Sequence, residues 1–574
     1  TMGSGHFLVN ATNHITNFIV KLLNEYPGNN SRIDSDPKIW RRKVVENCIF
    51  GVDLNPRAVE LAKLCLWIAT TFKEKPLSFL NHHLKKGNAL VGVRISDLEK
   101  HLIKTGVSDN NLFMQPYIDS IKQAAEYYKK KLSKFTDTIE DIEEKKEILE
   151  EVNGELVPYK NLCDVFTFYL LGKINESEFL SKIENWNAQK IPQKVPSISG
   201  NDDFFHWEIE FPDVLYGDNS GFDCVIGNPP YIQHQSTTYK PLIRKTKKCG
   251  NTYAFILEKS LNLLTYKGTY GFIIPMSSIC TERMLLLQNV LNSQSSKIKI
   301  ANFADRPSKI FSGVEQKVSM IHGEKKDKNK VPCKTFSSGY IQWNAEDRKI
   351  LFNENNKKIY YTYCEEFIKP GSIPKLYNNV EKNILKKISL MPHRIREITT
   401  NNENSRSYIC YHTIGRYWLT TFDFIPPYYR NGVKGISSDY KILSLKYDNI
   451  KDFIILLLNS SLFYCYWIIY SDCFHLTKKF IEDFPIPFKD ILDNSYGDIT
   501  NKLCKILMLD YQKHSILQES TYSTGRITHQ TFFPGKSKSI IDKIDIALGE
   551  LYGFDKQEID YIINYNIDFR INKD

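Results

Sequence analysis

The sequence lacks the cysteine patterns that mark metal sites and disulfide frameworks. Its twelve cysteines are scattered through 574 residues without a Cys-x-x-Cys pair, and the adjacent His82 and His83 have no Cys or His at zinc-finger spacing. Structural zinc sites and disulfide frameworks depend on such spacings. We therefore expect free thiols in a reducing cytoplasm and no bound metal ion.

Long uncharged stretches and a signal-peptide pattern are lacking as well. One stretch, 453–470, has no charge over 18 residues, but Asn459, Ser460 and Ser461 interrupt it. A membrane-spanning helix needs about 20 predominantly apolar residues. The stretch therefore predicts a buried helix or helix–turn pair, and we expect no membrane partner.

Neither sign of charge is scarce enough to define a function. A quarter of the residues are charged and the net charge is +10, which is a modest indication of a polyanionic partner. The length exceeds that of one ordinary domain. We expect several folded domains rather than a disordered chain.

The most informative stretch ends in Asn228-Pro229-Pro230-Tyr231. An apolar run, 224–226, predicts a short buried strand, and the two prolines then stiffen the loop that leaves it. A bare Pro-Pro pair would be an ordinary turn. Here the side-chain carbonyl of Asn228 and the backbone carbonyl of Pro229 can accept both protons of a planar amine, which leaves the nitrogen lone pair free to attack. Tyr231 can stack on the ring that carries the amine, so positioning and electrostatics suffice without a strong base. At these four residues the sequence resembles the amino-methyltransferases that use S-adenosylmethionine.

Two glycines near the start predict a turn that opens a helix. Gly3 and Gly5 flank a serine, and apolar residues follow at helical spacing at positions 8, 11, 15, 18, 19 and 22. Such a turn lets a ligand approach the backbone amides at a helix N-terminus. A lone Gly-x-Gly pattern is weak, and by itself it would indicate a loop.

Two further polar residues follow predicted strands. Asp53 ends the apolar run 48–52, where a strand-end carboxylate of a doubly wound sheet can bind ribose hydroxyls or cap the next helix. Asn88 follows Gly87 in a turn before an apolar pair, which suits the edge of an adenine ring. Taken alone, the second pattern is indistinguishable from any turn.

The order of these pieces resembles the gamma-class N6-adenine DNA methyltransferases, of the type IIG restriction–modification and BREX-type phage-defence kind. The likeness covers essentially the whole chain and includes the segments 60–68, 87–92, 205–212 and 221–223. It implies a doubly wound, Rossmann-like class I methyltransferase domain over 1–330, with S-adenosylmethionine as cofactor and double-stranded DNA as partner. The resemblance assigns cofactor contacts to Thr1, Gly3, Gly5, Asp53 and Asn88.

The sequence departs from this family at its front. The first family motif begins with an acidic residue and a proline ahead of the position of Thr1, after a strand and a Phe-Gly motif. We expect the chain to be an N-terminally truncated fragment, which puts cofactor binding in doubt. The resemblance also allows an endonuclease domain or subunit outside this chain, and it leaves the oligomeric state open.

Two regions of the first domain differ from its core. A Lys- and Glu-rich segment within 97–200 predicts a helical insertion, with the charge run 140–146 on a solvated face. After Tyr231 the chain becomes basic, and these side chains would face DNA phosphates unless they form only a solvated loop: Lys240, Arg244, Lys245, Lys247 and Lys248.

The resemblance places an aromatic partner for the target base at Phe311. Extracting a base from the duplex costs a few kcal/mol, and stacking on an aromatic ring returns roughly 1–3 kcal/mol. Tyr231 and Phe311 together could therefore about balance the cost of flipping, whereas one ring alone would fall short.

From about residue 331 the chain changes to short mixed elements rich in Tyr, Phe and Asn. Three pieces, 459–460, 483–487 and 547–553, resemble the target-recognition domain of the same family. We therefore predict a mixed α/β DNA-binding domain over 331–574.

The sequence thus predicts a site-specific methyltransferase acting on the N6 amine of a flipped adenine. Asn228, Pro229, Pro230 and Tyr231 would be the catalytic residues. Three alternatives stay open: a catalytically silent DNA-binding module, a methyltransferase for RNA or protein glutamine, and methylation of cytosine N4. Serine commonly replaces the asparagine in cytosine-N4 enzymes, which favours adenine.

Overall fold

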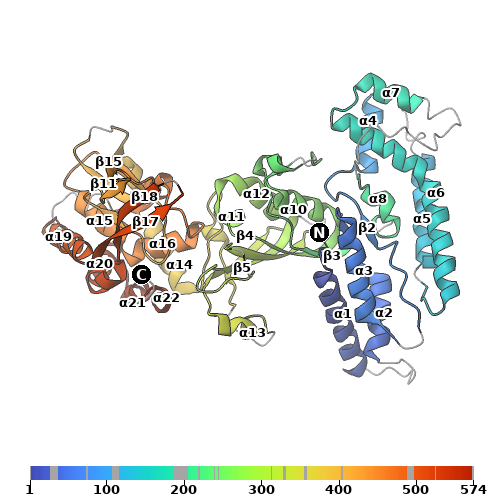
Figure 1. Ribbon diagram of the computed structural model, residues 1–574, viewed down its shortest axis with the longest axis horizontal. Coiled ribbons are helices and arrows are strands. Elements are labelled where there is room, and N and C mark those ends of the chain that lie inside the picture. The colour runs from blue at the N-terminus through green and yellow to red at the C-terminus, as the bar shows by residue number, and fades with distance from the viewer. Residues whose placement is uncertain are drawn as a thin grey trace. The chain divides into compact units, whose positions relative to one another are not determined.

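The computed structural model describes the chain except for residues 1, 26–35, 73–74, 106–114, 133, 185–203, 217–219, 238–239, 243–244, 312, 314, 328–330, 354–358, 403–404, 488–496, 524 and 572–574. Its fold is mixed α/β (Figure 1). Two compact units alternate along the chain. Unit 1 comprises 1–274, 286–298 and 321–333, and unit 2 comprises 275–285, 299–320 and 334–574. The predicted boundary near residue 330 stays a prediction.

Unit 1 opens with three helices around a small parallel strand pair. The helices are α1 (His6–Glu25), α2 (Pro37–Cys48) and α3 (Pro56–Thr70), drawn in blue in Figure 1. Strand β1 (Gly51–Asp53) pairs in parallel with β2 (Leu84–Lys86). The N-cap of α3 is Asn55, whose side chain accepts a hydrogen bond from the Arg57 amide at 3.0 Å. The predicted glycine turn with the helix behind it, and the predicted strand that ends at Asp53, are confirmed.

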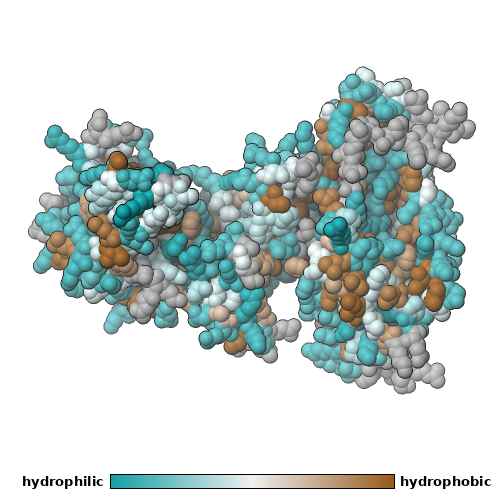
Figure 2. All heavy atoms as spheres, viewed as in Figure 1, coloured by the Kyte–Doolittle hydropathy of each residue, from teal (hydrophilic) through white to brown (hydrophobic). Residues whose placement is uncertain are grey.

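The apolar pattern of α1 does not lie wholly in the core. Leu8, Ala11, Ile15 and Ile19 pack in one cluster with α2 and α3. Phe18 is 59 % exposed and Leu22 is 40 % exposed, so these two residues of the helical pattern lie at the surface. Ile68 on α3 is also exposed, and Figure 2 shows apolar residues at the surface where Figure 1 draws α1 and α3.

The predicted insertion is helical, and its apolar residues share one cluster with Phe79, Val91, Val93, Phe204 and Ile209 outside it. It contains α4 (Ile95–Lys104), α5 (Gln115–Tyr127), a π-helical turn (Tyr128–Leu132), α6 (Ile139–Leu170) and α7 (Glu176–Glu184). The charge run was expected on a solvated face, but Lys145 is buried and its ammonium donates to Thr136 Oγ1 at 3.0 Å. That part of the prediction is wrong, because the lysine finds an internal acceptor.

The chain then returns to strands. Helices α8 (Trp207–Glu210) and α9 (Pro212–Leu215) precede β3 (Phe222–Gly227), α10 (Thr252–Leu263) and β4 (Leu264–Pro275). Strand β3 pairs in parallel with β4, with Ile226 opposite Gly271. Further along lie α12 (Leu285–Gln294), β5 (Ser295–Phe303) and β6 (Val318–Lys325). The strand order of the sheet is β3-β4-β6-β5-β7-β8, in which β7 is Lys334–Ile341 and β8 is Thr362–Tyr363.

The elements that lie wholly in unit 2 begin with α11 (Ser277–Cys280) and the antiparallel pair β7 (Lys334–Ile341) and β8 (Thr362–Tyr363). One small sheet has the order β10-β15-β11-β12, from Thr399–Thr400, Tyr440–Leu445, Tyr408–His412 and Thr421–Phe422. Another has the order β14-β13-β18-β17, from Val433–Gly435, Tyr428–Arg430, Gly525–Phe532 and Ser515–Tyr522. A third pairs β9 (His393–Arg394) with β16 (Pro485–Ile486).

The helices of unit 2 include α13 (Arg348–Leu351), α14 (Asn379–Ser389), α17 (Lys478–Glu482), α19 (Gly497–Lys513), α20 (Lys538–Leu551), α21 (Lys556–Ile563) and α22 (Ile567–Arg570). The uncharged stretch forms α15 (Lys451–Asn459) and α16 (Ser461–Tyr470), as predicted, and both are buried. Asp545 accepts the Ser461 amide at 2.8 Å and so caps α16. Within the described ranges no single helix has the length and apolarity of a membrane span, although α15 and α16, bent by 61°, pass that test as a pair.

Candidate active site

Three of the predicted site residues follow the carboxyl ends of parallel strands in unit 1. Asp53 is the last residue of β1, and the Gly87-Asn88 turn directly follows β2, whose Lys86 pairs with Asp53. Asn228 directly follows β3. The carboxyl ends of parallel strands are the usual place for ligands in open α/β sheets. The sequence therefore placed these residues at the correct ends of their strands.

The Asn228–Tyr231 loop is held by its own tyrosine. The Tyr231 hydroxyl donates toward Asn228 Oδ1 at 2.9 Å and toward the Ile273 carbonyl on β4 at 3.1 Å. Burial raises the pKa of Tyr231 to about 12, so the hydroxyl stays protonated at neutral pH. This contact fixes the orientation of the Asn228 amide. An amide oxygen has two lone pairs, and the Tyr231 hydroxyl occupies one of them.

The N-terminus of α10 holds the other side of the loop. Thr252 Oγ1 donates to the Pro230 carbonyl at 2.5 Å, and the Thr252 amide donates to the Ile232 carbonyl at 3.0 Å. In the described part of the chain the Pro229 carbonyl carries no such bond, so it can accept a ligand proton. Sequence reasoning missed Thr252. Its place after Asn251, which caps α10, was the only signal.

The glycine turn is tied to Asp53. Asp53 Oδ2 accepts the Met2 amide at 2.6 Å and the Gly3 amide at 3.3 Å, while Oδ1 accepts the Asn55 amide at 2.8 Å. Gly5 has φ +77°, and a Cβ there would lie 3.0 Å from Ala62 Cα, so both conformation and space require glycine. The predicted alternative, a capping role for Asp53 in α3, is replaced by this link to the turn. Thr1 lies outside the described residues.

Asn88 sits in a turn that joins two segments far apart in sequence. Its side-chain Oδ1 accepts the Leu90 amide at 3.1 Å, and Asn88 forms a parallel bridge with Phe204. A Cβ on Gly92 would lie 2.0 Å from the Phe205 carbonyl oxygen, so the backbones approach too closely for any side chain. The segments 87–92 and 205–212, which the resemblance singled out separately, thus pack against each other.

A cavity of about 560 Å³ adjoins these residues. Its walls are mostly apolar and include Met2, Val52, Leu90, Gly227 and Pro229. A pocket of this size and character suits a small organic ligand with a few polar contacts. The cavity therefore adjoins the glycine turn, the end of β1 and the Asn228–Tyr231 loop within unit 1.

Two ionisable groups near the cavity were not found from the sequence. Lys259 on α10 lines it, and burial, with a contribution from Arg94, lowers the pKa of this lysine to about 8. Glu210 is bound by Lys85 at 3.1 Å and Lys160 at 2.6 Å. Burial raises the pKa of Glu210, but the two lysines outweigh burial and hold that pKa at about 2. No spacing pattern marks either group.

The remaining predicted residues are only partly described. Lys240, Lys245, Lys247 and Lys248 are exposed in unit 1, whereas Arg244 lies outside the described residues. Phe311 is half-buried in a loop of unit 2. Its pairing with Tyr231 of unit 1 stays a prediction. The described residues contain no group of three or more His, Cys, Asp or Glu that could hold a metal ion.

Arg348 fixes the loop that leads to Phe311. Its guanidinium donates to the Lys309 carbonyl at 3.1 Å and to the Ile310 carbonyl at 2.8 Å. The same group lies over the Trp343 ring, 5.7 Å from its centroid. The carbonyls directly before Phe311 are therefore anchored to α13.

Comparison with known proteins gives a match to one family and to a longer relative. Residues 47–311 match the family model described as Eco57I restriction-modification methylase. A provisionally named type II restriction enzyme and methyltransferase from Methanocaldococcus jannaschii is 25 % identical over 424 residues. That match covers 67 % of this chain and 34 % of the relative, so the chain spans about a third of the relative's length.

Two solved structures resemble the chain weakly. The type IIL restriction-modification enzyme MmeI in complex with DNA gives a TM-score of 0.36 at 10 % identity, over 97 % of this chain and 76 % of that one. A nuclease-deletion mutant of the type ISP enzyme LlaGI with a DNA substrate mimic gives 0.35 at 10 % identity, over 73 % and 27 %. We draw no functional conclusion from either, because both TM-scores are below 0.5.

Proposed function

We propose that the chain methylates the N6 amine of adenine in DNA, and the match of residues 47–311 to the Eco57I restriction-modification methylase family supports this proposal. The reaction would serve a restriction–modification or phage-defence system. The doubly wound class I methyltransferase arrangement of unit 1 is part of the proposal.

The observation that carries the proposal is the geometry of the Asn228–Tyr231 loop. The Asn228 amide is held by the Tyr231 hydroxyl at 2.9 Å, and the neighbouring Pro229 carbonyl can accept a proton. Two acceptors on one rigid loop can bind both protons of a planar amine. That interaction localises the nitrogen lone pair and orients it for attack, with little reorganisation during reaction.

S-adenosylmethionine would supply the methyl group when bound beside this loop. The residues present suit it: Asp53 retains acceptor capacity for ribose hydroxyls, the Gly3–Gly5 turn admits close approach, and Asn88 has a side-chain amide for a ring amine. The apolar cavity of about 560 Å³ offers room at the same strand ends. Pro229 lines that cavity, which would bring acceptor and cofactor together.

The partner would be duplex DNA. In this proposal Tyr231 and Phe311 stack on the flipped base, and residues 331–574 recognise the sequence. The exposed lysines 240, 245, 247 and 248 would neutralise phosphates, which would make affinity fall with salt. An endonuclease domain or subunit outside this chain also belongs to the proposal.

Transfer of labelled methyl from S-adenosylmethionine to unmethylated bacterial DNA, followed by nucleoside analysis, tests this function. We expect N6-methyladenine as the product. N4-methylcytosine as the only product would refute the adenine assignment, and DNA binding without any product would leave only a binding module.

A further inference from the structure

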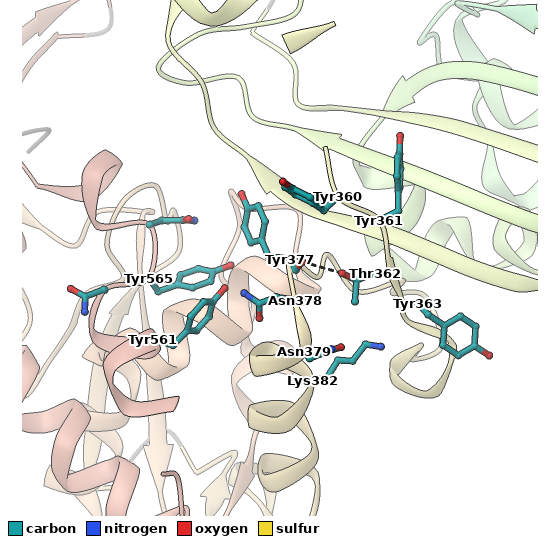
Figure 3. Close-up of a pocket in the computed structure, with 12 residues that line it drawn as sticks. Tyr360, Tyr361, Thr362, Tyr363, Tyr377, Asn378, Asn379, Lys382, Tyr561 and Tyr565 are labelled. Atoms are coloured by element: carbon teal, nitrogen blue, oxygen red, sulfur yellow. Dashed lines mark hydrogen bonds between the residues drawn. The ribbon is translucent and has the colours of Figure 1, made fainter. Parts of the chain in front are cut away.

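Unit 2 contains a pocket with an unusual composition. It has a volume of about 830 Å³, and six of its twelve lining residues are tyrosines while four are asparagines. Figure 3 shows these side chains around the start of α14. None of the lining residues is acidic, and Lys382 is the one charged side chain among them. We call it the tyrosine–asparagine pocket.

One wall of the pocket is fixed by hydrogen bonds. The Tyr377 hydroxyl donates to the Tyr340 carbonyl, and Thr362 Oγ1 donates to the Tyr377 carbonyl at 3.0 Å. The Tyr561 hydroxyl donates to the buried Glu381 at 3.0 Å. These rings therefore form a preorganised surface, which lowers the entropic cost of binding.

The opposite wall carries exposed rings. Tyr360 is 61 % exposed and Tyr361 is 40 % exposed, and both lie directly before strand β8. Exposed tyrosines offer a flat apolar face at little conformational cost. A planar ligand could stack on them and cover them from water.

Positive charge lies beside the same rings. Lys382 Nζ is 5.8 Å from the centroid of Tyr363, and Lys299 Nζ is 5.4 Å from that of Tyr361. The N-terminus of α14, capped by Asn378, also opens into the pocket. Lysines and helix N-termini both favour anions. The charge thus points to a planar ligand that carries a negative group.

We propose that the tyrosine–asparagine pocket binds a nucleotide unit, separately from the Asn228 loop. The base stacks on the ring of Tyr360, the more exposed of the two, since every nucleobase has a face that suits an aromatic ring. The asparagine amides, which both donate and accept, meet the polar edge of the base. The phosphate lies near Lys382. An unpaired strand of the DNA substrate is one source of the nucleotide, which rests on the proposed function, and a free mononucleotide is the other.

Fluorescence titration of the whole chain with two probes tests the pocket: adenosine monophosphate and a single-stranded oligothymidylate. Tyr360→Ala is the test variant and Tyr360→Phe retains the ring. Tyr266→Ala is a matched control in unit 1. Tyr266 is also an exposed tyrosine (51 %) beside a lysine, with Lys325 Nζ 5.7 Å from its ring centroid. We expect Tyr360→Ala to weaken binding about tenfold, and the other two variants to bind like wild type.

The probe that responds identifies the source. Loss of oligonucleotide binding alone assigns the pocket to a DNA strand, and loss of mononucleotide binding assigns it to a free nucleotide. Equal binding by Tyr360→Ala and wild type, or no binding of either probe by the wild type, overturns the proposal. An Asn228→Ala background separates this result from the methylation reaction, because binding in the pocket should survive there.

Discussion

Glu381 gives unit 2 a pH-dependent stability that substitution should remove. Its carboxylate is fully buried beneath the tyrosine–asparagine pocket, where it accepts hydrogen bonds from the Tyr561 hydroxyl and the Tyr377 amide. Burial raises the pKa of Glu381 from 4.5 to about 7. Tyr561, Tyr565 and Cys465 face the same carboxyl, but burial raises the pKa of each of them, so they stay neutral in this range.

The sign and size follow from linkage. Between pH 4.5 and about 7 the folded state keeps a proton that the unfolded chain has released, so stability decreases as pH rises. A shift of this size corresponds to about 3 kcal/mol. At pH 5 the Glu381→Gln variant should be less stable than the wild type by a fraction of this energy, because the glutamine NH₂ and the Tyr377 amide are both donors and face each other. As the pH rises to 8.5, the stability of the variant relative to the wild type should increase by up to about 3 kcal/mol.

Urea unfolding at pH 5, 6, 7 and 8.5, monitored by tyrosine and tryptophan fluorescence, measures this difference. Glu366→Gln is the control, since that carboxylate is half exposed beside Lys386. Its difference from wild type should stay nearly constant with pH. If the Glu381→Gln difference is equally flat, Glu381 is ionised in the folded protein and the reasoning is refuted.

Three further substitutions test other contacts. Asp53→Ala leaves the amides of the glycine turn without their acceptor, so thermal unfolding should show a loss of about 1–3 kcal/mol; unchanged stability would disprove the link. Arg348→Ala frees the carbonyls before Phe311, so fluorescence of 2-aminopurine at the target base should report less flipping, whereas unaltered flipping would exclude a positioning role. Replacing Lys247 and Lys248 by alanine should make the plot of log DNA affinity against log salt concentration less steep, by about one unit of slope per lost phosphate contact. A slope identical to that of the wild type would show that these lysines do not contact DNA phosphates.

The sequence predicted local features well where neighbours in the chain determine them. The turn at Gly3 and Gly5 and the helix behind it depend on a few adjacent residues, and both are present. The strand ends at Asp53 and before Asn228 follow from short apolar runs. The expectation that the run 224–226 is buried is wrong, because β3 is the edge strand of its sheet and Cys224 and Ile226 are exposed.

Contacts between distant segments were not predictable. Thr252 holds Pro230 from 22 residues away, and Asp545 caps α16 from 84 residues away. The burial of Lys145 depends on a tertiary acceptor, so its charged neighbours in sequence gave the wrong environment. The tyrosine–asparagine pocket joins residues near 360, 378 and 564, and no local pattern marks it. Long-range packing decides such features.

The most direct test of the proposed chemistry is the rate of N6-methyladenine formation by wild type and Asn228→Ala, measured together with DNA affinity. Asn47→Ala serves as control, because that asparagine is exposed on α2 and its side-chain amide donates to the Lys43 carbonyl in its own helix. The account predicts that Asn228→Ala loses on the order of 100-fold in rate, as when one preorganised group is removed from an active site, while it binds DNA like wild type. Full activity of Asn228→Ala would contradict the assignment of the amine-orienting site to this loop.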